Sequence, residues 1–134
     1  MNGTIRIAGA HDHGDGQPEI IKTESKATCQ LNEGIYTITY VDEDNITHFL
    51  EIGEGTINMK QTGQVTSDMR FKLGEVWSTP YSTPYGIMNM TVITKNLMIE
   101  LSNKRIAAHV HYELQMDGDK ISDSKVRISY NFEA

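Results

Sequence analysis

Two histidines separated by a single residue, His109 and His111, are the first candidates for chemistry in this sequence of 134 residues. Side chains two positions apart on a β-strand point the same way, so the two imidazoles could share one metal ion. The surrounding segment alternates polar and apolar residues, and both histidines fall on its polar side. We therefore expect them to face solvent and predict no metal site, although His11 and His13 could approach them from a loop.

Cys29 is the other residue whose type suggests chemistry, because a thiolate is a strong nucleophile. It alternates with residues expected to face the core, so we predict a buried, unreactive thiol. The sequence contains no Gly-x-Ser-x-Gly elbow, phosphate-binding loop, dinucleotide fingerprint or Cys-x-x-Cys pair. Catalytic carboxylates brought together from distant strands remain an alternative, but we predict a protein that is not an enzyme and uses no cofactor.

The charge balance limits the partners of the chain. Its 12 basic and 18 acidic residues give a formal charge of −6, and no stretch of the sequence is strongly basic. Because nucleic-acid binding depends mainly on Lys and Arg contacts to phosphates, we expect neither nucleic acids nor anionic membranes as partners.

Other global features place the chain among soluble proteins of a reducing compartment. A single cysteine allows no internal disulfide, and the first residues lack the features of a signal peptide. No segment approaches the roughly 18 apolar residues of a membrane-spanning helix. We therefore predict a cytoplasmic protein with one domain over residues 1–134.

The candidate residues must be positioned by β-strands. Turn-forming residues recur about every ten positions, and the short segments between them alternate apolar and polar residues. In the segment 65–73, for example, Met69 and Phe71 alternate with the charged Asp68 and Arg70. One side of each segment is therefore expected to be buried and the other exposed to solvent.

Ten or eleven such segments are too many for one flat open sheet. We predict an all-β fold, a single closed or nearly closed antiparallel up-and-down barrel of about 8–10 strands, with a two-sheet sandwich as the alternative. Residues 9–18 lack periodicity and are expected to form a flexible connection near one barrel mouth. The expected strands are 4–8, 19–31, 35–41, 46–52, 56–61, 65–73, 76–82, 86–94, 97–103 and 106–116, with an eleventh near 125–132.

The tetrapeptide Ser-Thr-Pro-Tyr occurs twice in succession, at 78–81 and 82–85, and Gly86 follows. Proline fixes φ and lacks an N–H, so Pro80 and Pro84 are predicted to lie at a strand edge, a bulge or a bend. Glycine then supplies the backbone freedom that a turn needs. The repeat therefore predicts a sharp change of chain direction.

The same stretch carries a resemblance to a known family. The motif Tyr81-x-Thr83-Pro84-Tyr85-Gly86, followed by Met88-x-Met90-x-Val92-x-Thr94, together with 34–40 and Met69-x-Phe71-x-x-Gly74, resembles the YwiB-like proteins. These are uncharacterised bacterial proteins grouped with the calycin, or lipocalin-like, barrels. The resemblance implies a calycin-type barrel and no particular activity. Gln61 stands where we expect an arginine in this family, so no role of that arginine is carried over.

The expected interior suggests a function, because it is rich in methionine and tyrosine. Barrels of about eight strands are either filled by side chains or hold one small ligand. Our first hypothesis is a non-enzymatic protein that binds a small, largely apolar ligand inside the barrel. The alternative is a packed barrel that acts in protein interactions or as a homodimer, through an aromatic patch of Trp77, Tyr81 and Tyr85. The predicted ligand-binding residues are Tyr36, Tyr40, Met69, Phe71, Trp77, Tyr81, Tyr85, Met88, Met90 and Tyr112.

Overall fold

The structure, a computed structural model, describes residues 1–133 and confirms the predicted all-β fold. Within these residues there is no helix, and hence none that could cross a membrane. The ten strands are β1 (Asn2–Asp12), β2 (Glu19–Asn32), β3 (Ile35–Val41), β4 (Thr47–Ile52), β5 (Thr56–Thr62), β6 (Ser67–Lys72), β7 (Val76–Thr83), β8 (Gly86–Leu101), β9 (Arg105–Met116) and β10 (Asp119–Phe132).

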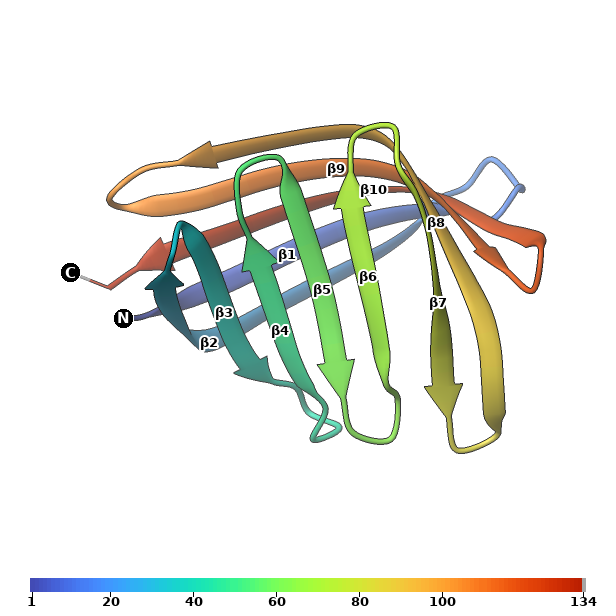
Figure 1. The fold of residues 1–134 in the computed structure, drawn as a ribbon, viewed down its shortest axis with the longest axis horizontal. Coiled ribbons are helices and arrows are strands. Elements are labelled where there is room, and N and C mark those ends of the chain that lie inside the picture. The colour runs from blue at the N-terminus through green and yellow to red at the C-terminus, as the bar shows by residue number, and fades with distance from the viewer. Residues whose placement is uncertain (134) are drawn as a thin grey trace.

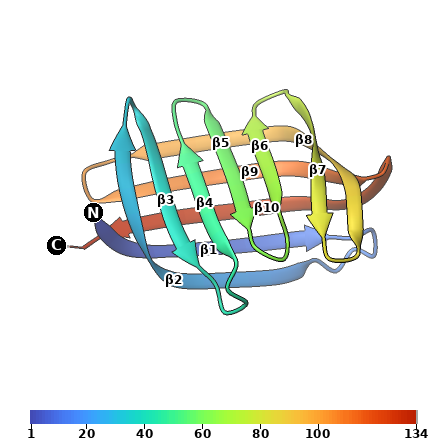
Figure 2. The same ribbon diagram turned by 60° about the horizontal axis from the view of Figure 1, so that its bottom comes forward.

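The strands form two layers that cross at a steep angle (Figures 1 and 2). Strands β3 to β7 stand side by side in one layer, and β1, β9 and β10 run across behind them. The long strands β2 and β8 belong to both layers, because each pairs with two different strands along its length. Strand β2 pairs with β1 up to Thr28 and with β3 from Thr28 onward. Strand β8 pairs first with β7 and then with β9. Such bent strands are a common way to join orthogonal layers.

All ten strands are joined in one continuous antiparallel sheet, which confirms the nearly closed barrel. The first and last strands pair over ten residue pairs, from Gly3–Phe132 to Asp12–Asp123. The remaining gap lies between β6 and β7, which are joined by a single bridge between Thr66 and Ser82. Each of these two residues donates its N–H to the other's carbonyl oxygen at 2.9 Å.

Tight turns set the register of the hairpins. Glu33 and Gly34, which join β2 to β3, both have positive φ, as type I′ hairpin turns require. The second Ser-Thr-Pro-Tyr copy also forms a hairpin turn, with Pro84 and Tyr85 between the paired Thr83 and Gly86. The hydroxyl of Thr83 accepts a hydrogen bond from the Tyr85 N–H and donates one to the Gly86 carbonyl, each at 3.1 Å.

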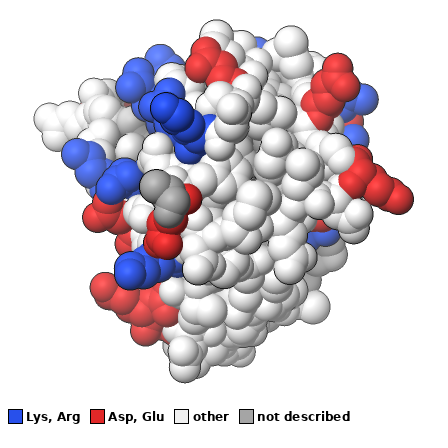
Figure 3. Space-filling view, turned by 90° about the vertical axis from the view of Figure 1, so that its left-hand side faces the viewer, with Lys and Arg blue, Asp and Glu red and all other residues white. Residues whose placement is uncertain are grey.

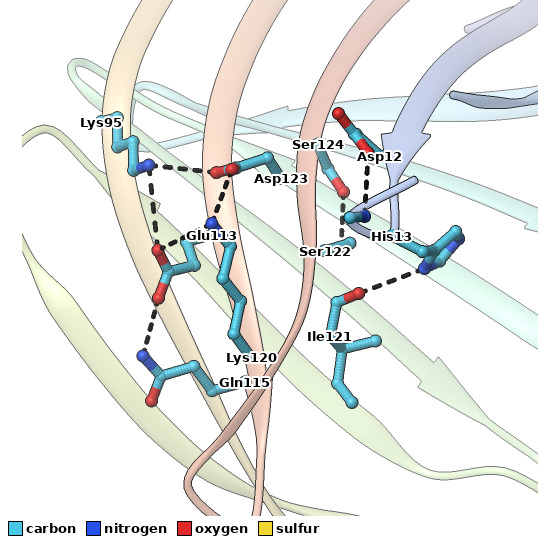
Figure 4. A network of polar contacts seen from close by, with 11 residues as sticks. Asp12, His13, Lys95, Glu113, Gln115, Lys120, Ile121, Ser122, Asp123 and Ser124 are labelled. Atoms are coloured by element: carbon cyan, nitrogen blue, oxygen red, sulfur yellow. Dashed lines mark hydrogen bonds and ion pairs between the residues drawn. The ribbon is translucent and has the colours of Figure 1, made fainter. Parts of the chain in front are cut away.

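The predicted turn at Lys95 and Asn96 is wrong, because β8 continues through it with a β-bulge. The extra residue, Lys95, points outward into a network of charged side chains (Figure 4). Its Nζ lies 3.0 Å from Asp123 Oδ1, and Lys120 Nζ lies 2.8 Å from Asp123 Oδ2. Hydrogen bonds from Lys120 and Lys95 lower the pKa of Asp123 to about 2. A locally irregular strand stabilised by tertiary contacts therefore replaces the expected turn.

Two other boundaries also differ from the prediction. Strand β1 extends to Asp12, so residues 9–12 of the segment 9–18 are strand and not loop. Strand β10 begins at Asp119 and not near residue 125. Pairing with β10 supplies backbone partners to residues 9–12, and pairing with β9 supplies them to the first residues of β10, although the sequence of both stretches favours a loop.

The interior is filled by one inward-facing row of side chains from each strand. Their apolar members form a single continuous cluster, and each fully buried Ile, Leu or Phe contributes about 1.5–3 kcal/mol through burial. The most deeply buried side chains include Ile5, Ile38, Leu50, Ile52, Ile57, Phe71, Met90, Val92, Ile106, Ile128 and Tyr130. This packed row explains why the hydrophobic alternation predicts the fold so well.

The seam between β6 and β7 is closed by side chains. In an antiparallel ladder, residues two apart point their backbone groups to the same side, so Pro80, like Ser82, directs its nitrogen toward β6. Because proline has no N–H, it ends the ladder after one bridge. The indole N–H of Trp77 then donates to the Asp68 carbonyl oxygen at 2.9 Å, and the Arg70 guanidinium lies 5.7 Å from the indole ring centroid.

Replacing Trp77 by Phe should weaken this seam. The substitution removes the indole N–H and leaves the Asp68 carbonyl without its partner, which costs about 1–3 kcal/mol. Denaturant unfolding followed by far-ultraviolet circular dichroism measures the loss. Ser78→Ala on the same strand is the control, because Ser78 bonds only to the exposed Thr91 hydroxyl and should change stability far less. Equal effects of the two substitutions would contradict the role of the indole.

The barrel should lose stability at alkaline pH through two tyrosines. Burial, with a smaller effect of Asp42 on Tyr40 and of Cys29 on Tyr130, raises the pKa of each phenol to about 12. The folded state therefore holds its phenol protons above the ordinary pKa of about 10, and stability present below pH 10 is lost as the pH rises toward 12. In Tyr130→Phe this alkaline loss should be smaller than in the wild type. Parallel pH profiles for both proteins would refute the assignment.

Candidate functional site

Nine of the ten predicted ligand-binding residues lie on inward-facing rows. Cross-strand partners share a face of the sheet, and Trp77 pairs with the buried Val92, while Tyr81 pairs with Met88. The tenth, Tyr85, is 99% exposed at the tip of the β7–β8 hairpin. The strand alternation therefore identifies the inward face correctly, and the residue outside it belongs to a turn where alternation no longer applies.

The inward residues do not gather at one place. The rings of Tyr36 and Phe132 lie 6.5 Å apart near the chain termini, and Tyr40 stacks on His48 at 4.6 Å beside the β3–β4 turn. Phe71 meets Tyr112 across the middle of the barrel at 4.8 Å. These contacts show aromatic side chains packing against their neighbours within the interior.

Five hollows of about 350–600 Å³ lie at the ends and on the outside of the barrel. Tyr36 borders a hollow of about 560 Å³ beside Leu31 and Phe132, at the end where both termini lie. Tyr40 borders a smaller one of about 350 Å³ formed with β2 and the β3–β4 turn. Within residues 1–133, the other eight predicted residues border none of these five hollows.

A row of polar side chains inside the barrel was not anticipated. The Nδ1 atom of His11 lies 2.7 Å from the Ser124 hydroxyl, which lies 2.9 Å from the Ser122 hydroxyl. Figure 4 shows the two serines beside the end of β1. Burial, followed by the nearby His13, lowers the pKa of His11 and favours its neutral form. The sequence contains the signal, because His11 continues the inward row of Gly3, Ile5, Ile7 and Gly9.

The polar row continues into β9 and β8. Tyr112 pairs with Ser124 on one side and with Thr94 on the other. Burial raises the pKa of the Tyr112 phenol, and a hydrogen bond with Ser124 opposes this rise. Thr94 is only 2% exposed, and its hydroxyl has no hydrogen-bond partner among the described residues. Ser124 is fully buried, so its hydroxyl is not exposed to solvent as an accessible nucleophile would be.

The β7–β8 hairpin has the most unusual surface of the molecule. Residues 76–94 contain no Asp, Glu, Lys, Arg or His, although 22% of the chain is charged. At its tip, which we define as residues 83–88, Tyr85 and Ile87 are 99% and 74% exposed. The tip extends beyond the end of β9, whose last residue pairs with Met90 (Figure 1).

The residues first considered for chemistry lie apart from these features. His109 and His111 are on the outer face of β9, as expected, and Cys29 is fully buried with its pKa raised by burial. Within the part of the chain that the structure describes, no three His, Cys, Asp or Glu side chains are grouped closely enough to hold a metal ion. Gln61, which stands in place of the expected arginine, donates a hydrogen bond to the Ser67 hydroxyl at 2.9 Å.

The fold has a close counterpart among solved structures. The crystal structure of the ywiB protein from Bacillus subtilis matches with a TM-score of 0.88, covering 99% of this chain and 92% of that one. The two sequences are 17% identical, so this similarity establishes the shared fold alone. No curated protein matches the sequence.

A protein-family model matches almost the whole chain, over residues 5–128. Its description is a domain of unknown function, DUF1934, and it spans the strands from β1 to most of β10. Together with the ywiB structure, it confirms the resemblance that the Thr-Pro-Tyr-Gly turn and its flanking strands indicated. The chain therefore belongs to the DUF1934 family.

Proposed function

We propose that the protein acts by association with other proteins and that its first partner is a second copy of the same chain. The observation that carries this proposal is the uncharged β7–β8 hairpin with its exposed tip. An exposed apolar tip on a protein that is otherwise rich in charge is typical of an interaction surface. The packed inward rows also suit a protein whose partner binds outside.

Electrostatics favour a second copy at this surface. The chain carries a formal charge of −6, so most approaches of two copies bring like charges together. The hairpin is a long stretch where two copies can meet without desolvating a charge. A twofold dimer uses the same patch on both subunits, and Tyr85 and Ile87 provide aromatic and aliphatic area for such a self-complementary contact.

Side-chain packing, and not strand pairing, is the expected mode of contact. The free edge of β7 faces the seam, where Pro80 lacks the N–H that a pairing strand would need. The neighbouring Asp68 carbonyl oxygen already accepts a hydrogen bond from the Trp77 indole N–H, so it is not free for a pairing strand. Two copies therefore meet more favourably through the tip than through the open strand edges.

A cytoplasmic location is part of this proposal. The single cysteine, Cys29, is buried and cannot form an internal disulfide, which suits a reducing compartment.

Self-association should depend on Ile87. Ile87→Asp places a charge in the proposed contact, and we expect dimerisation to weaken about tenfold or more, as for a central interface residue. Sedimentation equilibrium over a wide concentration range measures the constant. Val41→Asp is the matched control, because Val41 is a β-branched residue that is 53% exposed on a different strand. A wild type that is monomeric throughout, or equal weakening by both substitutions, would refute the proposal.

A small interior ligand is the second candidate function, and one observation favours it. The buried hydroxyl of Thr94, in a row with Tyr112 and Ser124, lacks a partner among residues 1–133. Buried polar groups are usually hydrogen-bonded, and a small ligand at this row would supply the missing partner of the Thr94 hydroxyl. Calycin-type barrels, to which the sequence resemblance points, would accommodate such a ligand inside.

Thr94→Val tests this second candidate, because valine keeps the shape and removes the hydroxyl. With a guest bonded to Thr94, protein from its own cells should carry a non-covalent adduct in native mass spectrometry, and the variant should lose it and become less stable. Without a guest, the variant should gain about 1 kcal/mol, since an unsatisfied polar group is removed. That gain, together with repeatedly adduct-free wild type, would exclude the ligand.

A further inference from the structure

A groove crosses the outer face of the sheet over β2, β1, β10 and β9. It consists of two adjoining hollows of about 600 Å³ and 500 Å³ that share Ala8, His109 and Arg127. Hollows of this size are typical of small-molecule sites. The groove shares no residue with the hairpin tip, so binding in the groove would be independent of the proposed self-association.

Small side chains form the floor of the groove and long ones form its rim. Ala8 pairs with Lys22 on one side and with Arg127 on the other, so a short side chain lies between two long cationic ones. Ala107 pairs with Ser129, another short side chain. The hollow therefore follows directly from the alternation of residue sizes across neighbouring strands.

The groove is strongly basic in an acidic protein. It is lined by five of the 12 basic residues and one of the 18 acidic ones, a formal charge of +4, which leaves −10 on the rest of the chain. In Figure 3, most of the visible Lys and Arg side chains lie on the left, the side that faces away from the viewer in Figure 1, with some Asp and Glu side chains beside them. The basic residues of the groove are Arg6, Lys22, Arg105, Lys125 and Arg127.

Most of this positive charge is not neutralised within the described chain. Glu24 forms an ion pair with Arg6. Among residues 1–133, the other four cations have no carboxylate within 4.0 Å. His109 lies between Arg127 and Met98 on neighbouring strands. Like charges held close together repel, and a bound anion would relieve that repulsion.

We propose that this groove binds a small, multiply phosphorylated molecule of nucleotide size. Arginine presents a planar fork of N–H donors that matches phosphate oxygens. Arg105 and Arg127 supply two such forks without a carboxylate partner at one end of the groove, beside Arg6, whose Nε is paired with Glu24. The alanine floor and the His109 ring offer an apolar surface for the rest of the molecule. Charge, donor geometry and size therefore point to the same ligand class.

A compact anion suits this surface better than a nucleic-acid strand. Polymer binding draws on many phosphate contacts along an extended basic path, whereas outside the groove this chain carries a formal charge of −10. Phosphates that extended beyond the groove would meet repulsion. The positive region therefore selects ligands that fit within it.

Isothermal titration calorimetry with ATP, ADP, pyrophosphate and adenosine tests the proposal. We expect ATP and ADP to bind, adenosine not to bind, and affinity to fall as KCl is raised. Arg105→Gln and Arg127→Gln should each weaken ATP binding about tenfold or more, because each removes a charge-assisted contact. Lys72→Gln is the matched control, since it makes the same change in net charge on an exposed position of β6, outside the groove.

The two arginine variants should remain folded, because they relieve repulsion between like charges, and thermal unfolding checks this. Retained stability with lost binding supports a ligand site over a structural role. The proposal is overturned if neither ATP, ADP nor pyrophosphate binds, or if Lys72→Gln weakens binding as much as Arg127→Gln. Tighter binding of a single-stranded ribo-oligonucleotide than of ATP at the same salt concentration would overturn the compact-ligand class.

Discussion

The ladder between the first and last strands is the contact on which the rest of the molecule depends. Ten residue pairs join β1 to β10 and turn a meander with two exposed outer strands into a nearly closed wall. Closure lets each strand direct one row of side chains into a common interior, where they form a single core. The same ladder places Ala8 beside Arg127, so it also creates the outer groove.

The alternation of apolar and polar residues predicts the faces of the strands because burial is a local consequence of strand geometry. It places Met90 and Phe71 inside and His109 outside, as the structure does. It fails at Lys95, where residues of turn-forming type sit in a bulge held by ion pairs with β9 and β10. Contacts between distant segments decide such positions, and a single sequence does not reveal them.

The candidate sites differ in how far the sequence reveals them. The uncharged hairpin is visible as a continuous run of residues, although the sequence does not show that Tyr85 is fully exposed. The basic groove is invisible, because Arg6, Lys22 and Arg127 belong to segments far apart in the chain and each is flanked by residues of other kinds. Overall charge therefore gave a misleading impression of an acidic surface, since only strand pairing brings these cations together.

The position of the seam has a consequence for synthesis. The barrel opens between β6 and β7, whereas the ladder that closes its other side joins β1 to β10, which is synthesised after the other nine strands. A growing polypeptide can form the meander from β1 to β6 early, but the outer edge of β1 keeps its backbone groups unpaired until residues 119–132 emerge from the ribosome. Completion of the barrel thus requires the synthesis of β10, and the nascent edge of β1 is open to wrong pairing until then.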